Sequence, residues 1–98
     1  GGEQQMLAFA RALARDIKLL MLDEPFEGLA PLIRNEISKI VLDIKNLGIT
    51  TIIVEQDAMA VLKLADRAII LDMGKVVFNG AAEEVRTNKE LREQYLAV

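Results

Sequence analysis

Two adjacent carboxylates, Asp23 and Glu24, directly follow the apolar run Leu19–Leu22. A short apolar run bounded by turn signals is typical of a buried strand, so both acids should lie at its carboxyl end. Ligands bind at that end of the strands in open α/β sheets. Neighbouring residues of an extended chain point in different directions, so Asp23 can hold a hard cation such as Mg2+ while Glu24 orients a water for attack. The alternative is a strand that simply ends in solvated acids.

A second strand should end at the same edge as the first. Proline at the first helical position and apolar residues at three- and four-residue steps predict a helix over Pro31–Leu47, with Gly48 at its C-terminal cap. The β-branched segment Thr50–Glu55 follows as a strand. Strand, helix and strand in this order form a right-handed βαβ unit with parallel strands. The polar side chain of Gln56 is therefore expected near the carboxylates, unless it is only a surface glutamine.

The remaining elements are predicted to serve as scaffold. Gly80 is expected to break the chain, and Asp57 and Asn88 are suitable helix caps. Phe26 is expected to pack on a neighbouring element. The expected elements are a helix at Glu3–Arg15, a helix at Ala58–Ala65, a hairpin of Ala68–Leu71 with Lys75–Phe78, and short helices at Ala81–Arg86 and Lys89–Leu96.

Composition excludes several classes of function. The 98 residues suffice for one domain at most, and the net charge of −3 provides no basic stripe for nucleic acid phosphates. With neither cysteine nor histidine, the chain has no disulfide framework and none of the common zinc ligand sets. Its longest charge-free stretch, Asn46–Val54, is far shorter than the roughly 20 residues that span a bilayer. We expect no nucleic acid partner and no direct membrane insertion.

The order of the motifs resembles that of the ATP-binding cassette (ABC) ATPases. In that family a signature loop of the LSGGQ type opens a helix and is followed by Walker B, a D-loop and a switch residue. Gly1-Gly2-Glu3 is similar to the end of the signature, LLMLDEP to Walker B, and Glu27-Gly28-Leu29-Ala30 to the D-loop. Together, in this order and spacing, these motifs are far more specific than any one of them.

The resemblance implies a partial P-loop NTPase fold of the α/β class, with ATP and Mg2+ as cofactors. It implies Asp23 as the Mg2+ ligand, Glu24 as the water-orienting base and Gln56 as a sensor of the γ-phosphate. The residues implied to contact nucleotide are Gly1, Gly2 and Glu3 of the signature and Gly28, Leu29 and Ala30 of the D-loop.

Two departures from the common family pattern resemble the branched-chain amino acid import subgroup. Ala30 stands where the D-loop commonly has aspartate, and Gln56 stands where the family usually has histidine. A glutamine amide can donate a hydrogen bond to phosphate, but it does not titrate near neutrality. The implied partners are a second ATPase subunit and transmembrane permease subunits. The implied location is the cytoplasmic face of the cell membrane, reached through the permease.

One family motif has no counterpart in this sequence. No GxxxxGK[ST] pattern, which would cradle the phosphates, occurs in it. We therefore expect residues 1–98 to form a single partial domain, the C-terminal part of a longer ATPase, and the chain alone not to hydrolyse ATP. One alternative is a self-associating α/β module with vestigial motifs, joined through the unpaired edge of the Leu19–Leu22 strand. Another is an ABC ATPase of the DNA-repair or translation type.

Overall fold

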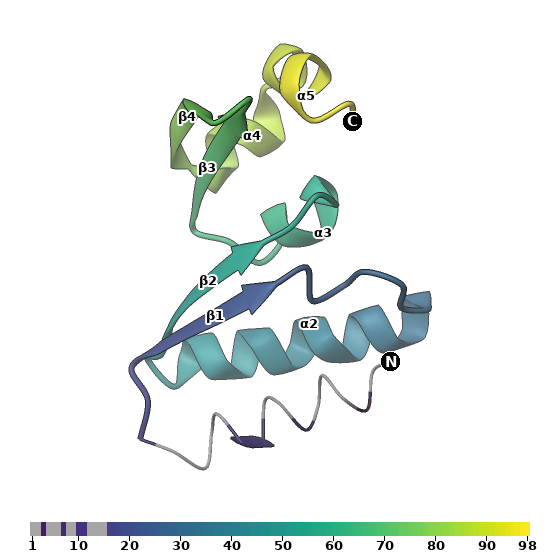
Figure 1. Ribbon diagram of the computed structural model, residues 1–98, viewed down its shortest axis with the longest axis vertical. Helices are drawn as coiled ribbons and strands as arrows, with labels where there is room; N and C mark the ends of the chain where they lie inside the picture. Colours follow the sequence, from purple (N-terminus) through teal and green to yellow (C-terminus); the bar gives the residue numbers. More distant parts are fainter. Residues whose placement is uncertain (1–2, 4–6, 8–9, 12–15) are drawn as a thin grey trace. The chain divides into compact units, whose positions relative to one another are not determined.

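The computed structural model describes residues 3, 7, 10–11 and 16–98 (Figure 1). The chain divides into two compact units, Gly1–Glu55 and Gln56–Val98, which we describe separately. Of the helix predicted at Glu3–Arg15, the four described residues are helical and exposed, and the rest lies outside the described residues. The single partial domain expected over residues 1–98 stays a prediction.

A parallel pair of strands joined by a helix forms the described part of the first unit. Strand β1 spans Leu19–Asp23, helix α2 spans Pro31–Asn46 and strand β2 spans Thr50–Val54. The register runs from Leu19 opposite Thr50 to Asp23 opposite Val54. Figure 1 shows the two arrows pointing the same way with α2 along them. The predicted βαβ unit is confirmed, and both strands end at one edge of the sheet.

Helix α2 begins and ends as its sequence predicts, within a residue. Pro31 is at the first helical position, and Ala30 before it has an extended backbone. At the other end the N–H of Leu47 donates to the carbonyl of Asp43 over 3.1 Å. Gly48 then takes a φ of 84°, a left-handed conformation that glycine adopts without steric cost. The helix is therefore capped by backbone geometry at both ends.

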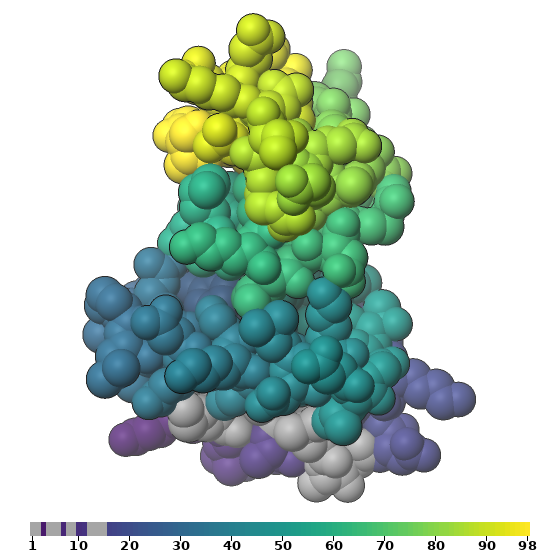
Figure 2. All heavy atoms as spheres, turned by 180° about the vertical axis from the view of Figure 1, so that it is seen from behind, coloured from purple at the N-terminus to yellow at the C-terminus, as the bar shows by residue number. Residues whose placement is uncertain are grey.

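Among the described residues of this unit, the buried apolar side chains form a core on one side of the strands. The side chains that are buried are Pro25, Phe26, Ile37, Val41 and Ile44. Successive side chains of a strand point to opposite faces of the sheet. Alternate residues of both strands are therefore exposed on the face that α2 does not cover. These exposed apolar residues, here called the open face, are Leu19, Met21, Ile52 and Val54. In Figure 2, seen from behind, the blue atoms of α2 form much of the surface of this unit.

The second unit combines a hairpin with three short helices. Its elements are α3 (Ala58–Leu62), β3 (Arg67–Asp72), β4 (Lys75–Ala81), α4 (Ala82–Thr87) and α5 (Lys89–Tyr95). The antiparallel strands turn through Met73 and Gly74, whose φ angles are 49° and 77°. The hairpin is confirmed at the predicted turn. The caps are confirmed too, since Asp57 accepts from the Ala60 N–H and Asn88 from the Leu91 N–H.

Two expectations about this unit are wrong. Gly80 does not break the chain, because β4 continues through it and pairs Gly80 with Ala68. A β-carbon at Gly80 would lie 3.0 Å from Cζ of Phe78, so the ring occupies the space that other residues would fill. Helix α3 ends at Leu62 rather than Ala65, because a tighter turn closes it, with the Leu64 N–H donating to the Val61 carbonyl.

The core of the second unit joins three of its elements. Leu62 of α3, Ile70 of β3 and Ala82 and Val85 of α4 form its buried centre. Arg86 adds a polar link, since its guanidinium donates to the Leu62 carbonyl and pairs with Glu83 at 2.7 Å. Among the helices in the part of the chain that the structure describes, none is long and apolar enough to cross a bilayer.

Replacing Val85 by alanine should destabilise the second unit by about 1.5–3 kcal/mol. The valine side chain is fully buried, and removal of its methyl groups would leave a cavity. Val76, in the same unit, is 60% exposed and provides the matched control, so Val76→Ala should cost less than about 0.5 kcal/mol. Urea unfolding followed by circular dichroism measures both. Equal destabilisation by the two variants would contradict the core assigned here.

Candidate functional site

The loop after β1 carries the candidate site, and its first residue has a strained backbone. Glu24 has a φ of 49°, in the left-handed region that non-glycine residues rarely occupy. Its N–H donates to the carbonyl of Val54 over 2.7 Å, and its own carbonyl accepts from the Glu27 N–H over 3.2 Å. The first bond extends the sheet ladder by one residue and the second closes a turn. Together they hold Glu24 where β1 and β2 end.

Phe26 anchors this loop to the body of the unit. Its side chain is only 1% exposed, and the Arg34 guanidinium lies over the ring, 5.9 Å from its centre. Its N–H donates to Oε2 of Glu55 over 3.2 Å. The prediction that Phe26 packs on a neighbouring element is confirmed, and the contacting helix residue comes from the first turns of α2.

Acidic side chains gather at this edge of the sheet. Asp23 ends β1, Glu24 and Glu27 lie in the loop, and Glu55 follows β2. The pKa of Glu24 is raised above its ordinary value, first by a side-chain hydrogen bond to Glu27 and then by the negative charge of Glu27. Desolvation and the charges of Asp23 and Glu55 act in the same direction. The loop therefore favours a protonated Glu24 more than free solution does.

The donor set suits a metal ion that is held mainly by a substrate. Among the described residues there is no group of three or more histidine, cysteine or acidic side chains placed to hold a metal. A complete protein cage for a cation is thus absent from this part of the chain. Mg2+ in nucleotide sites usually needs only one or two carboxylates, because phosphates and water fill the remaining positions. The exposed carboxylate of Asp23 fits that kind of site.

The structure brings some of the predicted site residues together. Asp23 and Glu24 adjoin at the strand end, and Gly28 and Leu29 lie in the same loop, where the Leu29 N–H donates to the Phe26 carbonyl over 3.4 Å. Gly28 has a φ of 72°, so the loop needs glycine there.

Other predicted site residues lie at the borders of this unit. Ala30 is the N-cap of α2, and Glu3 is helical and exposed. Gly1 and Gly2 lie outside the described residues. Gln56 is an exposed residue that opens the second unit, and its role as a phosphate sensor stays a prediction.

Sequence reasoning assigned no separate role to Glu27 or Glu55. The sequence predicts Glu27 as part of the D-loop and Glu55 as the end of a strand. The structure connects the first to Glu24 and the second to Phe26. Their position at the ends of two parallel strands was the available signal, but a hydrogen bond between residues 29 positions apart depends on the tertiary fold.

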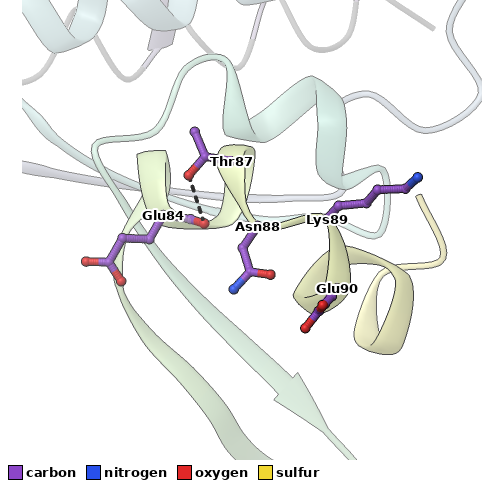
Figure 3. Close-up of a pocket in the computed structure, with 5 residues that line it drawn as sticks. All are labelled: Glu84, Thr87, Asn88, Lys89 and Glu90. Atoms are coloured by element: carbon purple, nitrogen blue, oxygen red, sulfur yellow. Dashed lines mark hydrogen bonds between the residues drawn. The ribbon is translucent and has the colours of Figure 1, made fainter.

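A hollow in the second unit carries none of the predicted site residues. Figure 3 shows it at the junction of α4 and α5, where the Thr87 hydroxyl donates to the Glu84 carbonyl. Its lining consists of Glu84, Thr87, Asn88, Lys89 and Glu90. The Thr87 bond and the Asn88 cap of α5 give these polar groups a role in ending one helix and starting the next. We therefore place the candidate site at the edge of the β1–β2 sheet.

Replacing Glu27 by alanine should lower the pKa of Glu24, because it removes both the hydrogen bond and the charge that raise it. A carboxyl group with a raised pKa in the folded state stabilises the fold in acid and loses this stabilisation as the pH rises through the raised pKa. This loss should be smaller in Glu27→Ala than in the unchanged chain. NMR titration of the Glu24 carboxyl carbon measures the pKa.

The matched control for this titration is Asp43→Ala. Asp43 is an exposed acid near the far end of α2. The Asp43→Ala variant should leave the pKa of Glu24 unchanged. If both variants move the pKa of Glu24 equally, Glu27 is not the cause of its shift.

Comparison with known proteins supports the resemblance seen in the motifs. No protein-family model matches the chain. The chain is 48% identical over 96 residues to the high-affinity branched-chain amino acid transport ATP-binding protein BraG of Pseudomonas aeruginosa, covering 98% of this chain and 41% of BraG. It is 35% identical over 96 residues to the lipopolysaccharide export system ATP-binding protein LptB of Haemophilus influenzae. This match covers 98% of this chain and 40% of LptB.

A solved structure agrees on the fold. The ADP conformation of MJ1267, an ATP-binding cassette of an ABC transporter, superposes with a TM-score of 0.80 at 29% identity, over 95% of this chain and 38% of that one. The predicted α/β fold, part of an ABC ATPase domain, is thereby confirmed. The chain spans about two fifths of the length of these relatives. Over nearly its whole length, the chain is similar to a part of ABC transporter ATP-binding proteins.

Proposed function

We propose that this chain forms part of an ATP-hydrolysing subunit of an ABC transporter and supplies the acidic edge of its nucleotide site. One observation carries the proposal. Asp23 ends β1, Glu24 follows it, and the Glu24 N–H is bonded to the end of the parallel strand β2. This is the sheet edge at which α/β proteins bind ligands.

Each of the two acids has its own task in this proposal. Asp23 would hold Mg2+, and a cation bound there would supply positive charge next to the phosphates. Glu24 accepts a hydrogen bond from the attacking water and orients it. A base works best when its pKa approaches the working pH, and contact with Glu27 moves Glu24 in that direction. The strained turn keeps Glu24 at the strand end, where it is partly exposed.

The resemblance implies roles for further residues. Gln56 donates its amide to the γ-phosphate, a contact that needs no proton exchange. Gly28, Leu29 and Ala30 face a second ATPase subunit as the D-loop. Gly1, Gly2 and Glu3, as the end of the signature, contact the γ-phosphate of ATP held by the opposite subunit. The chain alone should not hydrolyse ATP, because its sequence has no phosphate-cradling GxxxxGK[ST] loop.

We infer that the transported solute is a branched-chain amino acid. The 48% identity to BraG supports this, as do Ala30 and Gln56 at the two positions that depart from the common pattern. LptB, at 35% identity, serves lipopolysaccharide export, so the ATPase fold alone does not set the solute. In this proposal the subunit acts at the cytoplasmic face of the membrane, bound to transmembrane permease subunits that select the solute.

A fusion protein tests the catalytic roles. This chain should replace the matching 96-residue segment of BraG, and phosphate release should be measured with Mg-ATP. We expect the fusion to hydrolyse ATP and the chain alone to release none. Glu24→Gln should lower kcat by about a hundredfold or more, because the amide cannot act as a base. Asp43→Asn, on the exposed side of α2, is the matched control and should leave kcat unchanged.

Two results would contradict this proposal. The first is phosphate release by the chain alone above the rate of its own Glu24→Gln variant. The second is an active fusion whose kcat is the same with Glu24→Gln as with Asp43→Asn. The first result would overturn the expectation that the chain alone is inactive, and the second would remove Glu24 from the catalytic step.

The open face favours a second property, self-association of the isolated chain. Met21 and Ile52 are directly paired across β1 and β2, and Met21 is 68% exposed. Within the described residues each strand of this sheet has only one strand partner. Exposed apolar faces and unpaired strand edges promote pairing between chains. We propose that two copies cover their open faces against each other.

A charge on the open face should prevent this association. Multi-angle light scattering should show a dimer or larger species for the unchanged chain and a monomer for Met21→Lys, because a buried lysine would lose its hydration. Met73, which is 94% exposed at the hairpin turn, provides the matched control, and Met73→Lys should still associate. A monomeric unchanged chain at high concentration would refute the proposal.

A further inference from the structure

A side chain from the end of β2 holds the loop that carries Glu24. Glu55 is the last residue of the first unit, directly after β2. Its Oε2 atom accepts the Phe26 N–H over 3.2 Å, although 29 residues separate the two in sequence. Hydrogen bonds to an ionised carboxylate are stronger than those between neutral groups. Glu55 therefore connects the two strand ends through a side chain.

The Phe26 N–H needs such a partner. Phe26 is almost fully buried, and its ring lies under Arg34. A backbone N–H at a buried residue costs free energy when it has no acceptor. The neighbouring backbone bonds in this loop use other donors, namely the N–H groups of Glu24, Glu27 and Leu29. Removal of the Glu55 carboxylate would thus leave the Phe26 N–H without the acceptor it has here.

The strained conformation of Glu24 depends on its surroundings. A non-glycine residue with positive φ persists only where neighbouring contacts hold it. Two bonds tie the loop to β2: the Glu24 N–H to the Val54 carbonyl, and the Phe26 N–H to the Glu55 carboxylate. The first bond uses the backbone carbonyl of Val54, which a residue of any type at that position would provide. The second needs a side chain of suitable length with an acceptor oxygen.

We propose that Glu55 is a positioning residue, which sets the orientation of the Glu24 carboxylate by fixing the Phe26 N–H at the end of β2. The catalytic consequence rests on the function proposed above for Glu24. Glu55 itself does not touch nucleotide or water in this proposal. Its effect should therefore be on turnover and not on the affinity for ATP. A glutamine at this position keeps the length and an acceptor oxygen, so it should preserve the bond.

Hydrogen exchange of the Phe26 amide in the 98-residue chain tests the bond itself. Glu55→Ala should accelerate exchange at Phe26 about tenfold or more, and Glu55→Gln should restore a rate near that of the unchanged chain. The amide of Ile44, buried in α2, reports global unfolding. Unchanged exchange at Phe26, or equal acceleration at Ile44 and Phe26, would overturn the proposal. Asp43→Ala is the matched control and should change neither rate.

Steady-state kinetics of the BraG fusion test the consequence for catalysis. Glu55→Ala should lower kcat about tenfold with the KM for ATP unchanged, and Glu55→Gln should recover most of the loss. A rise in KM alone, or no recovery with glutamine, would overturn the positioning role.

The failure of this inference can be told apart from failure of the proposed function. If Glu24→Gln leaves kcat unchanged, the proposed function fails, whatever the exchange at Phe26 shows. If Glu24→Gln lowers kcat but Glu55→Ala does not, only the positioning role of Glu55 is overturned.

Discussion

The parallel pairing of β1 with β2 is the constraint on which the first unit depends. A parallel pair requires a crossover, and α2 supplies it while burying Ile37, Val41 and Ile44. Because both strands run the same way, the polar residues that follow each one arrive at one edge. The loop from β1 can then bond to the end of β2 twice, through Glu24 and Phe26. An antiparallel pair would have placed these ends on opposite sides.

The acidic edge carries an electrostatic cost that nearby contacts offset. The hydrogen bond to Glu27 raises the pKa of Glu24, and the like charges close to it act in the same direction. The left-handed backbone of Glu24 adds strain. Nearby contacts offset these costs, notably the burial of Phe26 and its N–H bond to Glu55. A bound cation would reduce the repulsion between these carboxylates further. The acidic edge therefore suits a ligand site that is occupied when the protein is active.

Apolar surface is exposed in both units. The open face is one instance, and the hairpin exposes Ile69, Leu71, Met73 and Val76. Large contiguous apolar patches on soluble proteins usually mark surfaces that contact another chain or segment. The relatives are more than twice as long as this chain, and their additional sequence has no counterpart in it. A longer polypeptide or another copy of the chain can therefore cover such faces. In the first unit, the strand residues that it would contact are those of the open face.

The sequence by itself determined the local elements, the motif order and the family resemblance. Periodicity, Pro31 and Gly48 predicted α2 within a residue, because these signals act within one turn of helix. It also placed Asp23 and Glu24 at a strand end. Only the tertiary structure decided that Glu55 accepts from Phe26 and that Gly80 continues β4. These features depend on contacts between segments far apart in the chain or on a neighbouring ring, and local sequence signals do not encode such distances.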